Sequence, residues 1–511
     1  MNNKINSNQE ELKKKLAGFR KKNKKIVLCH GVFDVLHYGH ILHFDEAKNL
    51  GDVLIVSVTA DKFVNKGPNR PIFNLATRMK MLASINNIDF IVPNNDETPI
   101  DLIKNLKPNV YCKGKDYIDS KNDVTGNIKK EIKAIKLAGG KIHYSKTPLM
   151  SSSQVINQTS LNLNEKQKKF INKIKNNSDF NKNQSVPSIF NSFKDLKVLV
   201  IGETIIDQYV FCESLGKSGK EPVLVLRDLY SEKYLGGAAA IANNISEFCE
   251  KVTILSNIGE KKEEEQFILK KLKKNIKKIF INKNNSPTIV KKRFLDEINK
   301  TKVLGVYSIN DQPLDKEEEK KFIFKLSEEI KKHDLVIVSD YGHGLISKKS
   351  AKEIIKKSKF LAVNTQVNAS NIGYHVISKY KGANFITVNE TELRHELRDK
   401  NSEVTELIKK ISNNLKCKYV TVTCGDEGAF IYNRLAKKIN HSPAFASKVV
   451  DKVGTGDTML ILIALALYNK LDLDFSMLIS SLAAAENINN FANKKNLVKN
   501  NLIKSVQAYL K

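Results

Sequence analysis

Short apolar segments alternate with longer amphipathic segments along most of the chain, and this alternation restricts the fold more than any other feature. Residues 26–29 form the first apolar run, and a helical pattern over 40–50 follows it. The alternation continues with strands predicted at 53–56, 90–92 and 110–112 and helices at 79–85 and 100–106. Buried strands separated by helices are typical of a parallel sheet covered on both faces, so this stretch is predicted to be α/β.

A second α/β stretch follows a polar segment. Residues 176–188 are rich in Asn and Ser, which favours a linker, with one helix predicted before it at 165–175. New strands are predicted at 197–201, 335–339, 385–388 and 419–422, with a charged amphipathic helix at 316–332. A chain of 511 residues is long enough for two or more domains. The predicted division is a first domain over 1–158, a linker over 159–195 and a second domain over 196–511.

The formal net charge of +30 comes from 85 basic and 55 acidic residues, and only eight of the basic residues are arginine. A lysine excess fits either a polyanion-binding surface or a general preference for lysine on the surface. Recognition of phosphates and base edges favours the planar fork of arginine. The scarcity of arginine therefore favours the surface interpretation, and no nucleic-acid partner is expected.

Cysteine and apolar content point to a protein of the cytoplasm. The six cysteines include no CxxC pair, so neither a disulfide scaffold nor a cysteine zinc site is expected. The most apolar stretch, residues 459–468, is far shorter than the roughly 20 residues that span a bilayer. The first eight residues contain no apolar run of the secretory type. We therefore expect no membrane partner.

A first candidate site lies where the strand at 26–29 leads through a loop into a helix. His37 and His40 stand three residues apart at the expected helix start, and Gly31 and Gly39 allow close approach of a ligand. Helix N-termini at the carboxyl end of a parallel sheet attract phosphate. Two imidazoles there could stabilise charge on a pentavalent phosphorus. The alternatives are two solvent-facing histidines, or a metal site that would need a third ligand.

The surrounding sequence resembles the cytidylyltransferase type of nucleotidyltransferases, whose signature is HxGH after a strand. The resemblance covers about residues 24–157 and is nearest to the adenylyltransferase half of bifunctional ADP-heptose synthesis enzymes. It implies a Rossmann-like domain in which His37 and His40 stabilise the transition state. The other nucleotide- and phosphate-binding residues that it implies are Gly31, Val32, Phe33, Lys66, Arg78, Lys113, Ser152 and Ser153. Asn157 stands near the place of an arginine that the family usually has.

A second candidate site is the glycine-rich turn before the apolar run at 459–467. Gly454, Thr455 and Gly456 would present backbone N–H groups to an anion at a helix start. Asp457 beside them could accept a proton from a substrate hydroxyl. A plain helix-capping loop would explain the same residues.

Residues 197–511 as a whole resemble the ribokinase-like (PfkB) sugar kinases. The resemblance makes Asp457 the general base and the Gly454–Gly456 segment the anion hole. It implies that the sugar contacts are Asp207, Gly236 and Gly237. It also implies a nucleotide loop containing Thr423, Gly425 and Gly428, and a link to Mg²⁺ through Asn389 and Glu392. The segment 339–344 resembles the SDYGKG segment of the heptose kinases.

Three features depart from the heptose enzymes. Ala240 stands where the family usually has a sugar-contacting Asn. Asn364, Thr365 and Gln366 stand where the heptose kinases have Asp-Pro-Lys. The transferase precedes the kinase here, whereas the familiar enzyme has the opposite order. The first two changes touch substrate positions and suggest an altered sugar, or a kinase domain kept for binding alone.

These observations together predict a bifunctional enzyme for synthesis of a nucleotide-activated sugar of the ADP-heptose kind. One domain would phosphorylate a sugar or sugar phosphate with ATP, and the other would join a sugar 1-phosphate to a nucleotide from ATP or CTP. The expected partners are nucleoside triphosphates and sugar phosphates, with Mg²⁺ as cofactor and a homodimer as the possible assembly. The alternative is a nucleotidyltransferase for a sugar or polyol phosphate whose kinase-like domain has an altered or lost sugar specificity.

Overall fold

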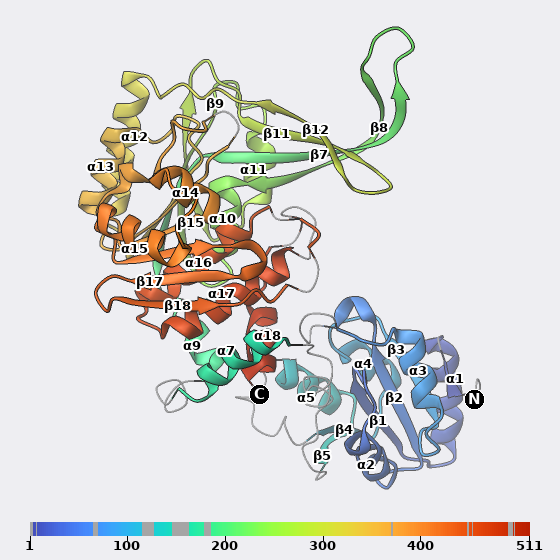
Figure 1. Ribbon diagram of the computed structural model, residues 1–511. Helices are drawn as coiled ribbons and strands as arrows, with labels where there is room; N and C mark the ends of the chain where they lie inside the picture. Colours follow the sequence, from blue (N-terminus) through green and yellow to red (C-terminus); the bar gives the residue numbers. More distant parts are fainter. Residues whose placement is uncertain are drawn as a thin grey trace. The chain divides into compact units, whose positions relative to one another are not determined.

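A computed structural model describes residues 4–6, 8–64, 70–114, 127–145, 163–177, 185–368, 371–446, 449–451, 453–488, 494 and 496–510 (Figure 1). The chain divides into two compact units. The first comprises Met1–Leu163 with Ile503–Lys511, and the second comprises Asn164–Leu502. Both units are α/β, as the alternation of apolar segments predicts. None of the helices in the described part of the chain has the length and apolar character needed to cross a bilayer.

The first unit is built on a five-stranded parallel sheet in the order β3-β2-β1-β4-β5. Successive residues of its central strand face opposite sides: Val27 and Cys29 belong to one core, and Ile26 and Leu28 to the other. A strand buried on both faces must be apolar throughout, which explains the continuous run at 26–29. The strands are β1 (Ile26–Gly31), β2 (Val53–Thr59), β3 (Phe90–Asn94), β4 (Val110–Gly114) and β5 (Lys141–Ser145).

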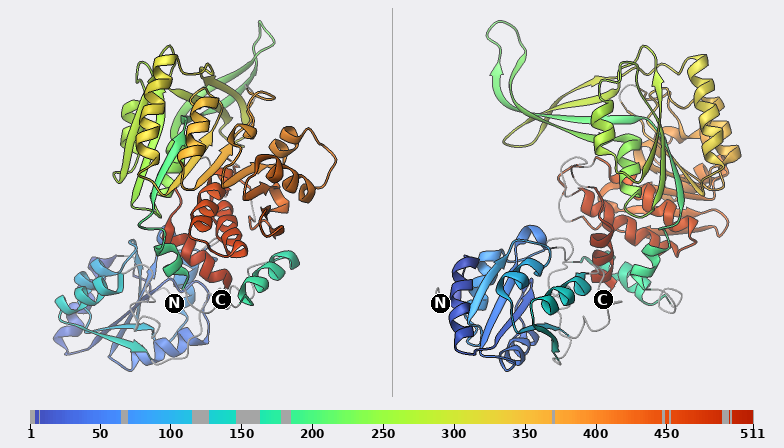
Figure 2. Two further views of the ribbon diagram at one scale, coloured as in Figure 1. Left: turned by 90° about the vertical axis from the view of Figure 1, so that its left-hand side faces the viewer. Right: turned by 180° about the vertical axis from the view of Figure 1, so that it is seen from behind.

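Helices cover both faces of this sheet (Figure 2). Phe44 and Ala47 of α2 pack with Met79 and Leu82 of α3 in one core, while α1, α4 and α5 contribute to the other. The helices are α1 (Gln9–Lys21), α2 (Tyr38–Lys48), α3 (Leu75–Ala83), α4 (Ile100–Leu106) and α5 (Asn127–Leu137). The strand order reverses between β1 and β4, and such switch points are where open α/β sheets bind ligands.

The second unit contains a nine-stranded sheet in the order β10-β9-β6-β13-β14-β15-β16-β17-β18. Its pairs are parallel except at β16–β17 and β17–β18. The strands are β6 (Lys197–Gly202), β9 (Lys251–Gly259), β10 (Ile276–Lys283), β13 (Leu335–Asp340), β14 (Leu361–Thr365), β15 (Phe385–Asn389), β16 (Tyr419–Thr423), β17 (Ala429–Asn433) and β18 (Lys438–Ser442). The strands predicted at 197–201, 335–339, 385–388 and 419–422 are confirmed as β6, β13, β15 and β16.

A separate four-stranded sheet, β12-β11-β7-β8, completes this unit. Its strands are β7 (Thr204–Lys217), β8 (Leu224–Gly236), β11 (Ile289–Asp296) and β12 (Lys302–Ser308). Figure 1 shows the end of the β7–β8 hairpin projecting from the body of the unit. The first residues of β7 and the last of β8 are buried, whereas the projecting ends are exposed.

The helices of the second unit include one that is buried along almost its whole length. Residues 457–467 of α16 are all buried, which explains the apolar run there. The segment 159–195 contributes α7 at the residues where a helix was predicted, and also α9. The helices are α7 (Glu165–Lys175), α9 (Val186–Asn191), α10 (Gly237–Ile245), α11 (Glu265–Lys271), α12 (Lys316–Ile330), α13 (Lys348–Lys357), α14 (Glu390–Leu397), α15 (Val404–Leu415), α16 (Thr455–Tyr468) and α17 (Leu473–Ile488). The last helix, α18 (Lys499–Leu510), begins in the second unit and ends among the residues assigned to the first.

Candidate active sites

The two histidines of the first unit lie together at the start of α2. His37 is the N-cap residue and His40 belongs to the first turn. Their rings stack with centroids 3.9 Å apart and planes 24° from parallel. The loop that carries them leaves the carboxyl end of β1, next to the point where the strand order reverses. Both imidazoles can therefore approach one anion bound at this helix N-terminus.

The loop before α2 is shaped to support His40. Phe33 adopts a positive φ of 50°, which a bulky residue rarely takes. Its ring packs edge-on to His40 at 5.4 Å and against Phe44 at 5.2 Å. A Cβ atom at Gly31 would come within 3.0 Å of the Phe33 ring, so a side chain there would displace the ring. Gly31, Val32 and Phe33 thus fix the path of the backbone beside the histidines.

Arg78 lies inside the unit with no exposed surface. Its guanidinium donates hydrogen bonds to the carbonyls of Phe73, Val32 and Thr59, and it pairs with Asp61 at 2.6 Å. These bonds tie the loop after β1 to the end of β2. This geometry is typical of a side chain that positions the loop, whereas the family resemblance implied that Arg78 binds phosphate.

Lys113 at the end of β4 is also buried. It forms an ion pair with Glu131 at 3.0 Å, and the same carboxylate accepts a hydrogen bond from Tyr111 at 2.9 Å. Lys66, Ser152 and Ser153, which were predicted to contact phosphates, lie outside the described residues.

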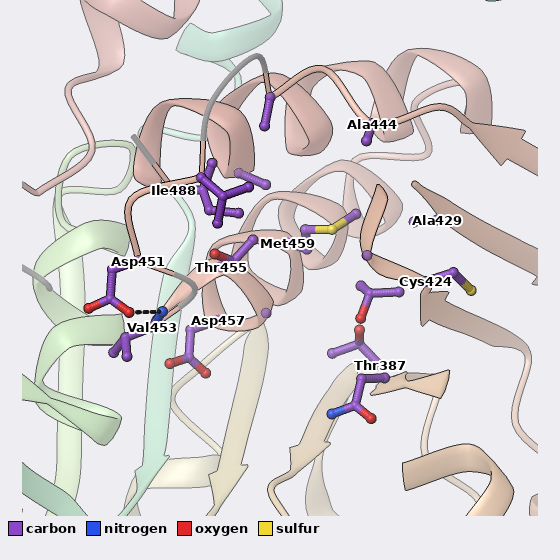
Figure 3. A pocket seen from close by; sticks show the side chains of 18 of the residues that line it. Thr387, Cys424, Ala429, Ala444, Asp451, Val453, Thr455, Asp457, Met459 and Ile488 are labelled. Atoms are coloured by element: carbon purple, nitrogen blue, oxygen red, sulfur yellow. Dashed lines mark hydrogen bonds between the residues drawn. The ribbon is translucent and has the colours of Figure 1, made fainter. Parts of the chain in front are cut away.

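The second unit holds a pocket of about 1280 Å³. Figure 3 shows Thr455 and Asp457 at the start of α16, next to the turn that carries Asp451 and Val453. Of the residues predicted for the kinase site, Gly236 is the one absent from the lining, and a Cβ atom there would lie 2.4 Å from Asp207 Oδ2. The predicted residues that the pocket brings together are Asp207, Gly237, Asn389, Glu392, Thr423, Gly425, Gly428, Gly454, Thr455, Gly456 and Asp457.

Asp457 has the surroundings that a general base requires. Burial raises its pKa to about 7, although a hydrogen bond from Tyr341 opposes that rise. The Tyr341 hydroxyl lies 3.1 Å from Oδ2, while no described residue donates a hydrogen bond to the buried Oδ1. An acceptor oxygen that is buried and has no donor is ready for a substrate hydroxyl. Gly454 caps the helix with a φ of 79°, so the turn before Asp457 uses a conformation that favours glycine.

Tyr341 is held in place by a second buried carboxylate. Glu203 accepts hydrogen bonds from the backbone N–H groups of Tyr341 and His343, each at 3.0 Å. Sequence reasoning missed both residues, because Glu203 lies between β6 and β7 whereas Tyr341 follows β13, far away in the sequence. The SDYGKG-like segment at 339–344 was the signal that could have pointed to Tyr341.

Replacing Tyr341 by phenylalanine is expected to move the pH dependence of phosphorylation to higher pH. The carboxylate form of the base accepts the proton, so the rate should rise as pH passes through the pKa of Asp457. The lost hydrogen bond stabilises that charged form and contributes about 1.5 kcal/mol, so its removal should raise the pKa by about one unit. The measurement is the pH profile of kcat/KM, and an unshifted profile would contradict the coupling.

Asn389 and Glu392 form a capping box at the start of α14. Asn389 Oδ1 accepts a hydrogen bond from the Glu392 N–H at 2.8 Å, and Glu392 accepts one in return from the Asn389 N–H at 2.9 Å. The other carboxylate oxygen of Glu392 accepts a hydrogen bond from Val367 at 3.2 Å. Each oxygen keeps further acceptor capacity, and both residues line the pocket. This donor set fits a hydrated Mg²⁺ that is held through its water ligands.

The pocket lining also includes two cationic side chains that sequence reasoning missed, one buried and one half-buried. Lys291 and Arg293 lie two residues apart on β11 and both line the pocket. Arg293 forms an ion pair with Asp207, and burial lowers the pKa of Lys291. Period-2 spacing on a strand puts both side chains on one face, but the sequence pattern did not single out this strand.

The loop that was predicted to bind nucleotide is the turn between β16 and β17. Gly425 and Gly428 both have positive φ, at 61° and 95°. A Cβ atom at Gly428 would lie 2.1 Å from the carbonyl oxygen of Ser442, so only glycine fits there. Thr423, at the end of β16, lines the same pocket.

Two of the positions that depart from the heptose kinases also reach this pocket. Asn364 and Gln366 line it, and the Asn364 amide donates a hydrogen bond to the carbonyl of Thr387 at 2.9 Å. Ala240 is buried in α10.

Two protein families match separate parts of the chain. Residues 195–495 match the pfkB family carbohydrate kinases, and residues 28–158 match the family described as cytidylyltransferase-like. The "Bifunctional protein HldE" of Campylobacter jejuni strain RM1221 is 30% identical over 292 residues, 57% of this chain and 60% of that relative. The protein of the same name from Aliarcobacter butzleri strain RM4018 is 43% identical over 134 residues, 26% of this chain and 28% of that relative.

In these matches the chain covers no more than 60% of the length of either relative. Among solved structures, phosphofructokinase-2 from Escherichia coli in complex with potassium matches with a TM-score of 0.51 and 14% identity. That match covers 61% of this chain and 99% of the other, and it supports a shared fold. The chain therefore belongs to the pfkB family of carbohydrate kinases, and a cytidylyltransferase-like domain precedes its kinase domain in the sequence.

Proposed function

We propose that the chain is a bifunctional enzyme that makes a nucleotide-activated sugar of the ADP-heptose kind. The second unit phosphorylates a sugar phosphate with ATP, and the first unit transfers a nucleotidyl group to a sugar 1-phosphate. The observation that carries the proposal is the Asp457 carboxylate, which has a pKa near 7 and faces a pocket that Lys291 and Arg293 also line. The relatives named bifunctional protein HldE support the pairing of the two activities.

In the kinase reaction, Asp457 accepts the proton of the sugar hydroxyl through Oδ1. That hydroxyl oxygen then attacks the γ-phosphorus of ATP in line, and ADP leaves. The N–H groups at the start of α16 face the transferring phosphoryl group, where charge develops in the transition state. Tyr341 keeps the carboxylate in position by donating to Oδ2.

Mg²⁺ is the cofactor that we propose for this step. Glu392, oriented by its bonds to Asn389 and Val367, would hold the hydrated ion. When bound, Mg²⁺ neutralises charge on the nucleotide phosphates. Glu392 lies close enough to Asp457 to contribute to the raised pKa of that carboxyl.

Lys291 and Arg293 support a substrate that carries a phosphate group. Asp207 neutralises one of the two cations, so this group of three side chains keeps a net positive charge inside the pocket. Burying an unpaired cation is unfavourable unless an anion joins it. A phosphate on the sugar would supply that anion, and Asp207 would accept hydrogen bonds from sugar hydroxyls.

In the transferase reaction, an oxygen of the sugar 1-phosphate attacks the α-phosphorus of a nucleoside triphosphate and pyrophosphate leaves. No covalent enzyme intermediate is needed. The stacked His37 and His40 donate hydrogen bonds to the charge that grows on the α-phosphate. Discrimination between ATP and CTP depends on a few contacts to the base.

A panel of sugars with and without a phosphate group tests the kinase assignment. The intact chain should phosphorylate a sugar phosphate with ATP, and Lys291→Met should raise KM for it by about 10- to 100-fold, the loss of one charge-assisted hydrogen bond. Lys292→Met is the matched control, because the neighbouring residue on β11 faces the other way. Equal KM values for Lys291→Met and wild type would contradict the phosphate site.

A second candidate is a kinase-like domain that binds a sugar without phosphorylating it. Asn364 and Gln366 favour this alternative, since they line the pocket where the heptose kinases have Asp-Pro-Lys. Phosphoryl transfer from ATP that depends on Asp457 separates the two candidates.

We also propose a cytoplasmic homodimer. The four-stranded sheet exposes apolar side chains on its projecting strands, and a second copy of the chain would cover them. These residues are Leu224, Val225, Leu229, Tyr230, Val303, Leu304, Val306 and Tyr307. Sedimentation equilibrium of the full chain measures the assembly directly.

A further inference from the structure

Two cysteines that are far apart in the sequence face each other in the first unit. Cys29 on β1 and Cys112 on β4 are register partners in the parallel sheet, and neither side chain has exposed surface. Both belong to the core under α2, together with Phe44 and Ala47 of that helix. The sheet therefore places two thiols side by side beneath the helix that begins at the HxGH motif.

His43 of α2 completes a group of three potential ligands. One ring nitrogen of His43 and the sulfur atoms of Cys29 and Cys112 all lie within 4.8 Å of one another. In a tetrahedral zinc site with Zn–S bonds of about 2.3 Å, neighbouring ligand atoms are roughly 3.7 Å apart. Small side-chain rotations would therefore bring the three atoms onto one ion.

The surroundings of His43 resemble the support that metal ligands receive. The buried Ser145 hydroxyl lies 3.0 Å from His43 Nδ1 and fixes the plane of the ring. On the next turn of α2, Glu46 accepts from His143 Nε2 at 2.8 Å, and His143 is the register partner of Cys112 on β5. A hydrogen bond like that between Ser145 and His43 orients a ligating histidine and raises its affinity for metal.

The burial and the ligand types of Cys29, Cys112 and His43 favour metal binding over the other roles of buried thiols. Nucleophilic and redox cysteines need access to substrate or oxidant, which the burial of both side chains denies. Two sulfurs and an imidazole are the ligands that zinc prefers, whereas magnesium and calcium prefer oxygen.

We propose that Cys29, Cys112 and His43 bind one thiophilic divalent cation of the Zn²⁺ class. Three protein ligands leave one coordination position for water, which can enter beside the half-buried His43. The ion would join β1, β4 and α2, and so would hold the start of the helix that carries His37 and His40. The site does not depend on the activities proposed above.

Titration of the reduced full-length protein with Co²⁺ tests the site. We expect one equivalent to produce thiolate-to-cobalt charge-transfer absorption together with the visible bands of tetrahedral cobalt, and Zn²⁺ to abolish both by displacement. Cys29→Ser and Cys112→Ser should each remove most of the charge-transfer absorption.

Ser145→Ala should lower the affinity for Co²⁺ by about 10-fold, as for other residues that orient a ligand. Cys249→Ser is the matched control, a buried cysteine of the second unit that should leave the spectrum unchanged.

Because serine at a fully buried position can prevent folding, His43→Gln gives an independent readout. His43 is half-buried, so this variant should keep the native circular dichroism while its Co²⁺ affinity falls by at least about 10-fold. Absence of charge-transfer absorption from the wild-type protein would overturn the proposal. Absorption that persists in the folded Cys112→Ser variant, or an unchanged affinity in His43→Gln, would also overturn it.

Discussion

Replacing Asp457 by asparagine is expected to lower the rate of ATP-dependent sugar phosphorylation by about 10²- to 10⁴-fold, the usual contribution of a positioned general base. Asparagine keeps the size of the side chain but its amide does not accept a proton at neutral pH. The carboxylate is well suited to this step because burial has brought its pKa to about 7, close to the pH at which the enzyme would work. The measurement is kcat for phosphoryl transfer, with ADP formation as the readout.

Two controls separate a catalytic loss from a structural one. Asp474→Asn changes another buried aspartate in the first turn of a helix of the same unit, and it should keep nearly full phosphorylation if the protein folds. Nucleotidyl transfer by Asp457→Asn should equal that of the wild type, because the HxGH motif belongs to the other unit. If a folded Asp457→Asn protein phosphorylated sugar at the wild-type rate, Asp457 would not be the general base.

Replacing His37 or His40 by alanine is expected to lower nucleotidyl transfer by about 10²- to 10³-fold, the loss that follows removal of one preorganised donor to transition-state charge. The two rings stack at 3.9 Å, so they would serve the same phosphate. Their effects should therefore be far from additive, and the double variant should lose much less than the product of the single losses. The measurement is pyrophosphate release with a sugar 1-phosphate and either ATP or CTP.

The exposed residue between the two histidines offers a matched control. Tyr38→Ala alters the same helix start, but its side chain is 63% exposed, and we expect transfer within about twofold of wild type, as for most surface substitutions. Phosphorylation of sugar by His37→Ala should be unchanged. If His37→Ala and His40→Ala both retained full transfer, the proposed role of the HxGH motif would be wrong.

Much of each site could be predicted from the sequence because its residues are close together along the chain. The first strand, the loop after it and both histidines lie within residues 26–40. Gly454 and the first turn of α16 likewise contain the three N–H groups and Asp457. Glycine, helix-start and apolar patterns are local signals that periodicity reports directly. The predicted element types at these motifs are confirmed by the structure.

Contacts between distant strands required the tertiary structure. Asp207 and Arg293 meet because β7 and β11 pair in a small sheet whose strands the sequence pattern did not predict. Arg78 illustrates the same limit, since the family resemblance implied phosphate binding and only the structure shows that its guanidinium is buried among carbonyl groups.

The sequence by itself determined the α/β class, the two stretches of alternation and the local motifs of both candidate sites, because each depends on residues within one or two turns or strands. Only the tertiary structure decided which side chains share a pocket, how burial raises the pKa of Asp457, and that Cys29 and Cys112 lie side by side with His43. The absence of a CxxC pair argued against a cysteine metal site, but that pattern detects only cysteines that are close together in the chain. Parallel strands instead bring together residues that a whole βα segment or more separates, and no local pattern records their register.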